Sequence, residues 1–413
     1  MAHQTHRRVV ITGLGVVAPN GIGKEAFWHA LNKGMLSVKP VQRFPTVNFP
    51  IQVAGEICDF NAEQHIDRKL ANRTDRMTHF VLAAVQEALH DAQLVIEQED
   101  PKCVGAVIAT TAGGLEFVHE QLQALYVRGP RFMSVFTAIA WLQVANVGQT
   151  SVRYGLQGYS KAPVNNIVGG LDALGMAFTS IQRGAADVLI SGGCESLVLP
   201  ALLLMLGYSD LCVTGDNPKA YRPFDQRAAG LVLADGAGIC IVEEYEHARR
   251  RGARIYGEIV GYGQTNDALG FGIPAHNGKQ YARAMQLALQ EAQSHSEDIG
   301  YFSLDGRALP LTDQTEVDAL RRTFGTDLQR LPVSVPRTMY GHSFAAAGAL
   351  DTITALLAFQ ECMIPPTMNC EQLIPQYGLD LVQNEARPLS RSTALIGGRS
   401  LSGANVVLAI KKV

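Results

Sequence analysis

Residues 167–174 read Ile-Val-Gly-Gly-Leu-Asp-Ala-Leu, and a strand-like run, Val188–Gly193, follows after an apolar stretch that ends near Arg183. This order predicts a loop, a helix and then a strand. Apolar residues continue nearly all round the predicted helix, which is typical of a helix enclosed between two sheets.

The same order recurs in the second half of the chain. Residues 348–353 read Gly-Ala-Leu-Asp-Thr-Ile and open a second apolar helix, and Ala394–Gly398 supplies the strand after it. Because this repeat is far longer than a solenoid period, it predicts the duplication of a whole α/β unit.

Strands and helices alternate on both sides of these two segments. Apolar residues at helical spacing predict a helix from Met77 to Leu89, and Asp313–Glu316 has the form of a capping box that opens another. The alternation predicts mostly parallel sheets that are covered on both faces. Short β-branched runs predict strands at Val9–Thr12, Val104–Ala109, Val188–Ser191, Gly238–Val242, Ile255–Val260, Val333–Val335 and Asn405–Ile410.

The composition excludes several classes of protein. The chain has 413 residues, of which 47% are hydrophobic, so a large core can be buried. A net charge of −3 with both signs dispersed gives no electrostatic footprint for nucleic acid or anionic lipid. The sequence has no signal peptide pattern and no apolar run of the ~18 residues that a spanning helix needs. We therefore expect a cytoplasmic protein that binds neither nucleic acid nor membrane.

The seven cysteines are an odd number and form no Cys-x-x-Cys pair. They predict reduced thiols and no metal site. Cys194 comes directly after a predicted strand, so two interpretations stay open: a small buried thiol or a reactive nucleophile. The cysteines are Cys58, Cys103, Cys194, Cys212, Cys240, Cys362 and Cys370.

Five segments together resemble the β-ketoacyl synthase family over nearly the whole chain. They are Gly158–Gly193, Val9–Asn20, Phe224–Glu258, Gly341–Gly348 and Ser402–Asn405. The resemblance implies an α/β thiolase-like fold, in which a duplicated βαβαβαββ unit forms five layers, α-β-α-β-α. We expect the N-terminal half to cover residues 1–250 and the C-terminal half residues 251–413.

The positions that carry catalysis in that family are replaced in this sequence. The resemblance implies a cysteine nucleophile at position 167, where this chain has Ile167, and a hydrocarbon side chain cannot attack a thioester. It also implies two histidines that stabilise the enolate formed by malonyl decarboxylation. Asp305 replaces the first of them, Arg337 replaces the lysine before the second, and His342 is retained. A carboxylate at position 305 would repel the enolate, so we expect no independent condensing activity.

Two further features indicate which kind of member of this family the chain resembles. Arg399 and Leu401 stand where the family has the aromatic residues of a gate loop, so we expect that gate to be lost. The run Asp305–Pro310 is similar to that of the chain-length factor, the ketosynthase beta subunit of bacterial type II polyketide synthases. Such subunits usually carry glutamine at position 167, which supports malonyl decarboxylation, whereas Ile167 has no hydrogen-bond donor.

In the chain-length factor, a helix after an Ala-Gly-Gly run closes the tunnel in which the polyketide grows. Here that segment is Ala112–Leu122. Leu115, Val118 and Leu122 fall at i, i+3 and i+7, which places them on one helix face. We expect these three side chains to line the tunnel, although an ordinary interface or core stripe has the same spacing.

The resemblance implies an active ketosynthase as the partner in a heterodimer, with substrate delivered by acyl carrier protein. It implies no cofactor in this chain, because the partner handles the phosphopantetheine arm. Two alternatives stay open: an equivalent subunit of an aryl-polyene or other polyene synthase, and a homologue with catalysis of its own. The second would use an unusual nucleophile such as Cys194 or would decarboxylate malonyl groups through His342.

Overall fold

The duplication predicted from the sequence is visible in the order of the strands. The structure is a computed structural model that describes residues 7–413. Within these residues, the strands of both halves join in a twelve-stranded sheet. The N-terminal half contributes, in spatial order, β1 (Val9–Ala18), β8 (Gly236–Glu244), β7 (Val188–Glu195), β5 (Val104–Ala109) and β6 (Ser160–Lys161), and β2 (Gly21–Ile22) pairs with β1. The C-terminal half contributes β9 (Gly257–Asn266), β16 (Ala404–Lys411), β15 (Thr393–Arg399), β10 (Ile299–Ser303), β11 (Pro332–Ser334) and β13 (Asp380–Leu381).

The two halves repeat the same pairing. In each, the first strand pairs antiparallel with the last, as β1 does with β8 and β9 with β16. The last strand of each half also pairs antiparallel with its other neighbour, as β8 does with β7 and β16 with β15. The pairs β5–β7 and β10–β15 are parallel. The halves meet where β1 and β9 pair antiparallel at Val9, Val10 and Ile11. The sheet is therefore mixed, and the prediction of mostly parallel sheets was wrong because a strand that returns antiparallel closes each half.

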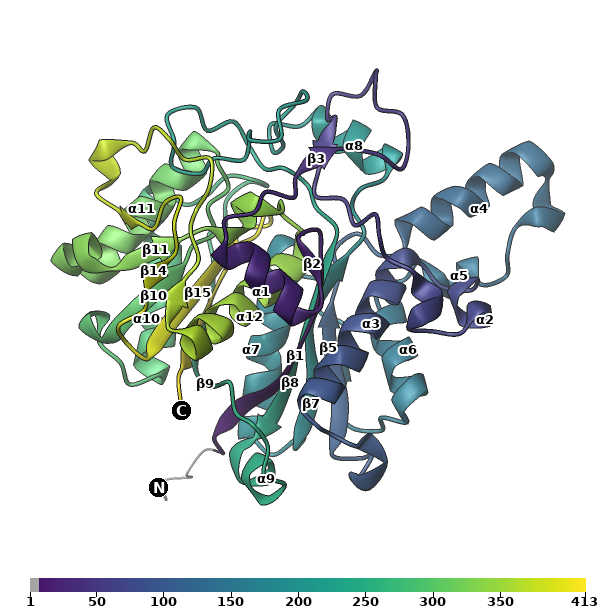
Figure 1. The fold of residues 1–413 in the computed structure, drawn as a ribbon, viewed down its shortest axis with the longest axis horizontal. Coiled ribbons are helices and arrows are strands. Elements are labelled where there is room, and N and C mark those ends of the chain that lie inside the picture. The colour runs from purple at the N-terminus through teal and green to yellow at the C-terminus, as the bar shows by residue number, and fades with distance from the viewer. Residues whose placement is uncertain (1–6) are drawn as a thin grey trace.

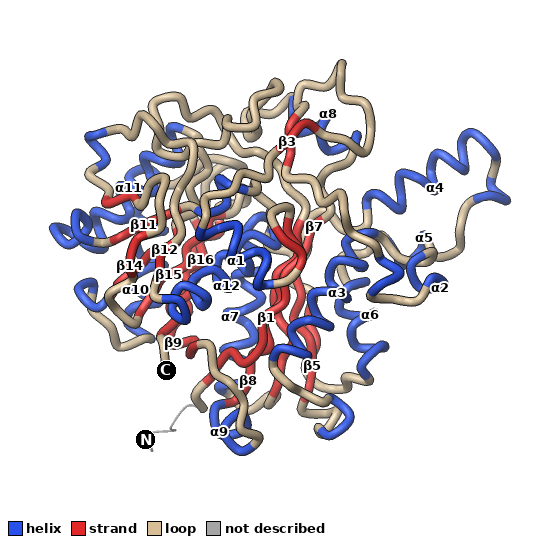
Figure 2. Tube along the Cα trace, in the orientation of Figure 1, coloured by secondary structure: helices blue, strands red, loops and turns tan. Residues whose placement is uncertain are grey.

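Helices cover both faces of each half-sheet, and Figure 2 shows the strands enclosed by them. Between the half-sheets lie α7 (Gly169–Gln182) and α12 (Ala345–Glu361), which contact strands of both halves. On the outer face of the N-terminal half lie α3 (Arg76–Asp91) and α6 (Ala145–Tyr154), and α10 (Lys279–Glu291) and α11 (Pro310–Phe324) cover the C-terminal half. This arrangement matches the five layers expected from the sequence.

The two central helices pack at unusually short distance at their N-terminal ends. A Cβ atom added at Gly170 or Gly193 would overlap the carbonyl oxygen of Ala345, and one at Gly348 would meet Leu171. Glycine is therefore required at these contacts, because a side chain at Gly170 or Gly348 would separate α7 from α12 and one at Gly193 would push α12 away from β7. The close packing brings the residues before α7 and before α12 together.

Further helices and strands complete the fold. Figure 1 shows one of them, α4, projecting from the body of the molecule. Across residues 7–413, no helix has the length and apolar character needed to span a lipid bilayer. The remaining helices and strands are α1 (Lys24–Asn32), β3 (Lys39–Pro40), β4 (Val53–Ala54), α2 (Arg68–Ala71), α4 (Leu115–Arg128), α5 (Thr137–Ala140), α8 (Pro200–Gly207), α9 (Tyr245–Arg250), β12 (Met363–Ile364) and β14 (Arg387–Pro388).

The predicted strands are all present, most of them longer than the β-branched runs that indicated them. The predicted capping box was wrong, since α11 begins at Pro310 rather than at Asp313. Proline suits the first helical position because its ring fixes a helical φ and that position needs no N–H donor. Asp313 and Glu316 therefore lie inside the helix, where their carboxylates are free to bond residues elsewhere in the chain.

Candidate functional site

Ile167 lies in a single turn, Asn166–Val168, immediately before α7. Its side chain is buried and belongs to an apolar cluster with Phe344, Leu115 and Leu401. The Thr111 hydroxyl donates to the carbonyl of Asn166 at 2.9 Å, and the Leu401 N–H donates to its side-chain oxygen at 3.3 Å. The position expected to hold a nucleophile is therefore filled by packed hydrocarbon.

His342 is fully buried close to the start of α12, and both of its ring nitrogens face donors. The Arg337 Nη1 lies 2.7 Å from Nε2, and the Phe344 backbone N–H lies 3.1 Å from Nδ1. Both neighbours are donors, and a neutral imidazole carries its proton on one of its two nitrogens, so only one of the two contacts is a hydrogen bond. In either tautomer the Arg337 guanidinium occupies the space beside Nε2. Burial and the charge of Arg337 lower the pKa of His342 well below its ordinary value.

Asp305 is fully buried and is held by two arginines. The Arg307 Nε lies 2.9 Å and the Arg399 Nε 3.1 Å from the same carboxylate oxygen, Oδ2. Burial alone would raise the pKa of Asp305, but Arg307, Arg399 and Arg337 outweigh it and hold the pKa below its ordinary value. Asp305 is therefore an ionised carboxylate in the place where the sequence resemblance implies a histidine.

The contacts of Glu316 and Asp351 complete this group of charges. Glu316 accepts the backbone N–H groups of Asp305 and Gly306, both at 2.9 Å, and Arg399 Nη2 lies 3.3 Å from it. Arg337 is paired through Nη2 with Asp351 on α12 and donates through Nη1 to the Asp305 carbonyl at 3.3 Å. We call this set the buried ion cluster; its members are Asp305, Arg307, Glu316, Arg337, Asp351 and Arg399, each at most 4% exposed.

The buried ion cluster occupies the space next to His342 with guanidinium and carboxylate groups that are already paired. An enolate needs a donor that is free to strengthen its hydrogen bond as negative charge develops. Here each guanidinium lies against a carboxylate of the chain itself, and the Arg337 guanidinium lies beside the imidazole. The arrangement therefore fills the space beside His342 with side chains that form ion pairs within the chain.

The structure places Arg399 and Leu401 at the end of β15 and in the turn that follows it. Arg399 also donates to the Thr315 hydroxyl at 3.0 Å, and its guanidinium lies 5.2 Å from the Tyr281 ring centroid. These contacts fix position 399 inside the C-terminal half. The loss of the gate remains a prediction, and the ion pairs of Arg399 are consistent with a fixed loop.

The three residues predicted to line a tunnel lie on α4, as expected. Leu115 and Val118 are partly buried, whereas Leu122 is 38% exposed. Large apolar side chains continue to be exposed after Leu122, along the rest of α4 and its return. They are Tyr126, Val127, Phe132, Val135, Ile139, Trp141 and Val144. An exposed apolar surface of this extent is typical of a protein interface.

Cys194 is the alternative nucleophile considered from the sequence. It is fully buried in β7, and the Asn146 side-chain nitrogen lies 2.8 Å from its sulfur. Burial, with the neighbouring Glu195 and Asp75, raises the pKa of the Cys194 thiol well above its ordinary value. A protonated thiol without access to solvent is a poor nucleophile, so this geometry favours the interpretation as a buried structural thiol.

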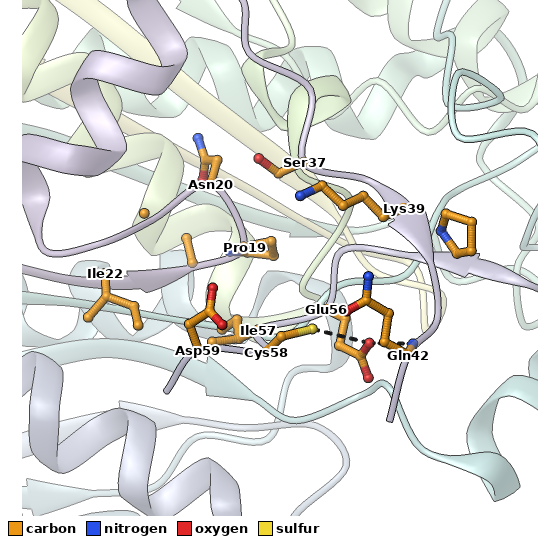
Figure 3. A pocket seen from close by; sticks show the side chains of 13 residues that line it. Pro19, Asn20, Ile22, Ser37, Lys39, Gln42, Glu56, Ile57, Cys58 and Asp59 are labelled. Carbon is orange, nitrogen blue, oxygen red and sulfur yellow. Dashed lines mark hydrogen bonds between the residues drawn. The ribbon is translucent and has the colours of Figure 1, made fainter. Parts of the chain in front are cut away.

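A surface pocket of about 420 Å³ lies beside the turn after β1 (Figure 3). Its polar lining includes Asn20, Ser37, Lys39 and Asp59, and none of its lining residues is a predicted site residue. Glu56 in its wall is engaged within the chain, because it accepts the backbone N–H of Gln42 at 2.7 Å. The pocket is therefore separate from the site around Ile167. In the described part of the chain, no group of three His, Cys, Asp or Glu side chains is placed to hold a metal ion.

Models of one protein family match both halves of the chain. The family model "Beta-ketoacyl synthase, N-terminal domain" matches residues 6–248, and "Beta-ketoacyl synthase, C-terminal domain" matches residues 256–371. The chain belongs to the β-ketoacyl synthase family. The thiolase-like fold and the family resemblance expected from the sequence are thereby confirmed.

Members of this family with different roles are almost equally similar to the chain. The tetracenomycin polyketide synthase ketoacyl synthase beta subunit of Streptomyces glaucescens is 38% identical over 98% of both chains. The 3-oxoacyl-[acyl-carrier-protein] synthase 2 of Staphylococcus aureus strain COL is 36% identical over 98% of this chain and 99% of its own. The solved structure titled "The ishigamide ketosynthase/chain length factor" matches with a TM-score of 0.92 and 28% identity, over 99% of this chain and all of that one.

The small difference in identity does not separate a beta subunit from a condensing enzyme, so the site residues must. The sequence predicted the replacements at 167, 305 and 337, and the structure shows that Asp305 and Arg337 contact each other through a backbone carbonyl. It did not predict that Glu316 and Asp351 belong to the same cluster. No local sequence pattern marks them, because Glu316 and Asp351 meet the cluster through residues that lie elsewhere in the chain.

Proposed function

We propose that this chain is the non-catalytic partner of an active ketosynthase and shapes the tunnel in which an acyl-carrier-protein-bound polyketide is extended with malonyl units. The observation that carries the proposal is Ile167, a packed hydrocarbon at the nucleophile position. The Arg337 guanidinium on Nε2 of His342 supports it, because the retained histidine is then unable to bind a malonyl carbonyl. The similarity to a ketosynthase beta subunit also supports the proposal.

The partner supplies what this chain lacks in the proposed complex. An active ketosynthase provides the thiol and handles the phosphopantetheine arm of acyl carrier protein, so this chain needs no cofactor of its own. The exposed apolar side chains of residues 122–144 provide a surface for the partner. A tunnel of apolar walls excludes water and suppresses premature cyclisation of a reactive polyketide.

The absence of independent catalysis is tested on the purified chain alone. Incubation with acyl and malonyl acyl carrier protein is expected to give no acylated protein by intact mass spectrometry and no release of carbon dioxide. The reason is that Ile167 has no nucleophilic atom and that Nε2 of His342 is occupied. The active ketosynthase, treated in parallel, is the positive control. A covalent adduct or carbon dioxide release from the isolated chain would instead support a catalytic homologue.

The tunnel is tested in the reconstituted complex with Leu115→Trp and Leu122→Trp. Each indole is expected to fill space at the end of the tunnel, so that the product becomes shorter by one or more two-carbon units. Product length is measured by mass spectrometry of the released polyketide. Gln286→Trp is the matched control, because Gln286 is exposed on α10 of the C-terminal half and lies outside both α4 and the apolar surface of residues 122–144. Unchanged product length in both leucine variants, with the complex intact, would refute the assignment.

A further inference from the structure

The direction in which α4 leaves the body is determined at its first turn. Figure 1 shows the helix extending outward from that point. Phe117 is the buried residue of α4, and the residues after it are partly or fully exposed. Contacts between the first turn and the body therefore orient the face that carries Leu115, Val118 and Leu122.

Asp75 joins the first turn of α4 to the first turn of α3. Its Oδ1 accepts the Met77 N–H at 2.8 Å, which caps α3, and its Oδ2 accepts the Phe117 N–H at 2.8 Å. The side chain is 1% exposed, and burial raises the pKa of Asp75 to about 7. One buried carboxylate thus satisfies N–H donors at the start of two helices and fixes their relative position.

A second contact holds the adjacent residue of the same turn. Glu116 is paired through Oε1 with Arg43, and its Oε2 accepts the Ser196 hydroxyl at 3.3 Å. Arg43 also donates to the Val198 carbonyl at 3.4 Å, so the pair connects α4 to the segment after β7. Both side chains are less than a third exposed, which limits screening by solvent.

The segment before α4 is held in the same way. Glu195 on β7 is fully buried and accepts the backbone N–H groups of Thr111 and Ala112. Gly114 donates to the Trp141 carbonyl at 3.0 Å, and a Cβ atom at Gly114 would overlap the carbonyl of Ala140. The base of α4 is therefore fixed to the sheet on one side and to its own return segment on the other.

A small rotation at this base has a large effect further along the helix. Leu115 and Leu122 are separated by about 10 Å at a rise of 1.5 Å per residue, so a tilt of ~10° displaces Leu122 by about 2 Å. A displacement of that size is comparable with the length of one two-carbon unit. The accuracy with which the end of the tunnel is positioned thus depends on the hydrogen bonds at the first turn.

We propose that Asp75 and the Arg43–Glu116 ion pair are positioning residues that set product length through the direction of α4. The inference rests on the proposed function, because it assigns a role within the same tunnel. None of the three side chains needs to contact the growing chain. They act by keeping Leu115, Val118 and Leu122 in one place relative to the partner subunit.

The experiment uses the reconstituted complex of this chain with an active ketosynthase and acyl carrier protein. Arg43→Met removes the ion pair, Arg43→Lys retains it, and Asp75→Asn removes one of the two acceptors. Glu258→Gln is the matched control, since Glu258 also pairs with an arginine, Arg8, but on β9. Product length distribution is measured by mass spectrometry, heterodimer formation by native mass spectrometry, and Leu115→Trp and Leu122→Trp are run in parallel.

Arg43→Met and Asp75→Asn are expected to broaden the distribution of product lengths while the heterodimer still forms. Arg43→Lys is expected to restore the wild-type distribution, and Glu258→Gln to leave it unchanged. An unchanged distribution in both Arg43→Met and Asp75→Asn, or loss of the heterodimer in Arg43→Met, would overturn the inference. If Leu115→Trp and Leu122→Trp also leave the product unchanged, the proposed tunnel itself fails, and the two results are thereby distinguished.

Discussion

Replacing Arg337 with alanine is expected to lower the free energy of unfolding of this chain by about 3–5 kcal/mol. The substitution leaves the Asp351 carboxylate buried without its cation and removes the guanidinium beside Nε2 of His342. Taking away one member of a buried ion pair is costly because the other remains desolvated. Urea unfolding at neutral pH, followed by circular dichroism, measures the change.

Two comparisons separate this effect from a general sensitivity to the loss of arginine. Arg68→Ala breaks an exposed pair with Glu63 and is expected to cost less than about 1 kcal/mol. Arg337→Lys is expected to give an intermediate loss, because one ammonium group cannot reach Asp351, His342 and the Asp305 carbonyl together. A cost for Arg337→Ala no greater than that for Arg68→Ala would contradict the importance of the buried ion cluster.

Replacing Gly170 with alanine is expected to destabilise the fold by about 2 kcal/mol or more, even though alanine is the better helix former. The new methyl group would overlap the Ala345 carbonyl oxygen, and a backbone atom cannot rotate away as a side chain does. The central helices α7 and α12 must then move apart. Thermal and urea unfolding of the variant measure the loss.

Gly148→Ala is the matched substitution for that experiment. Gly148 lies within α6, and no atom beyond its chain neighbours and the backbone of its own helix turns lies within 4 Å of the position of an added Cβ. Alanine there is expected to increase stability by about 0.5–1 kcal/mol through its helix propensity. Equal effects of the two substitutions would show that the contact between α7 and α12 is not a tight one.

The fold could be predicted from the sequence because its signals are local and repeated. The two runs that begin at Gly169 and Gly348 each combine a helix start with a following strand, and the same pair appears in both halves. The start of α11 could not be placed from its capping pattern, because Pro310 and the long-range partners of Asp313 and Glu316 determine it. A side chain that bonds a distant segment has no signature in the residues next to it.

The sequence predicted which residues of the candidate site are replaced but not how they contact one another, for a related reason. Each replacement at positions 167, 305 and 337 was evident by itself, since a change of residue type at a known position needs no structure. Their mutual pairing was not, because Asp305 and Arg399 are 94 residues apart and meet through the order of β10 and β15. The anchoring of α4 by Asp75 was missed for the same reason.

The buried ion cluster also limits how this chain can evolve. A histidine at position 305 would leave Arg307 and Arg399 without their shared carboxylate, and a cysteine at position 167 would still leave His342 in contact with Arg337. The substitution at position 305 would lower stability, because two buried guanidinium groups would lose their shared counter-charge. Restoring the residues that the family uses for catalysis would therefore require several simultaneous substitutions, including replacement of the arginines around Asp305.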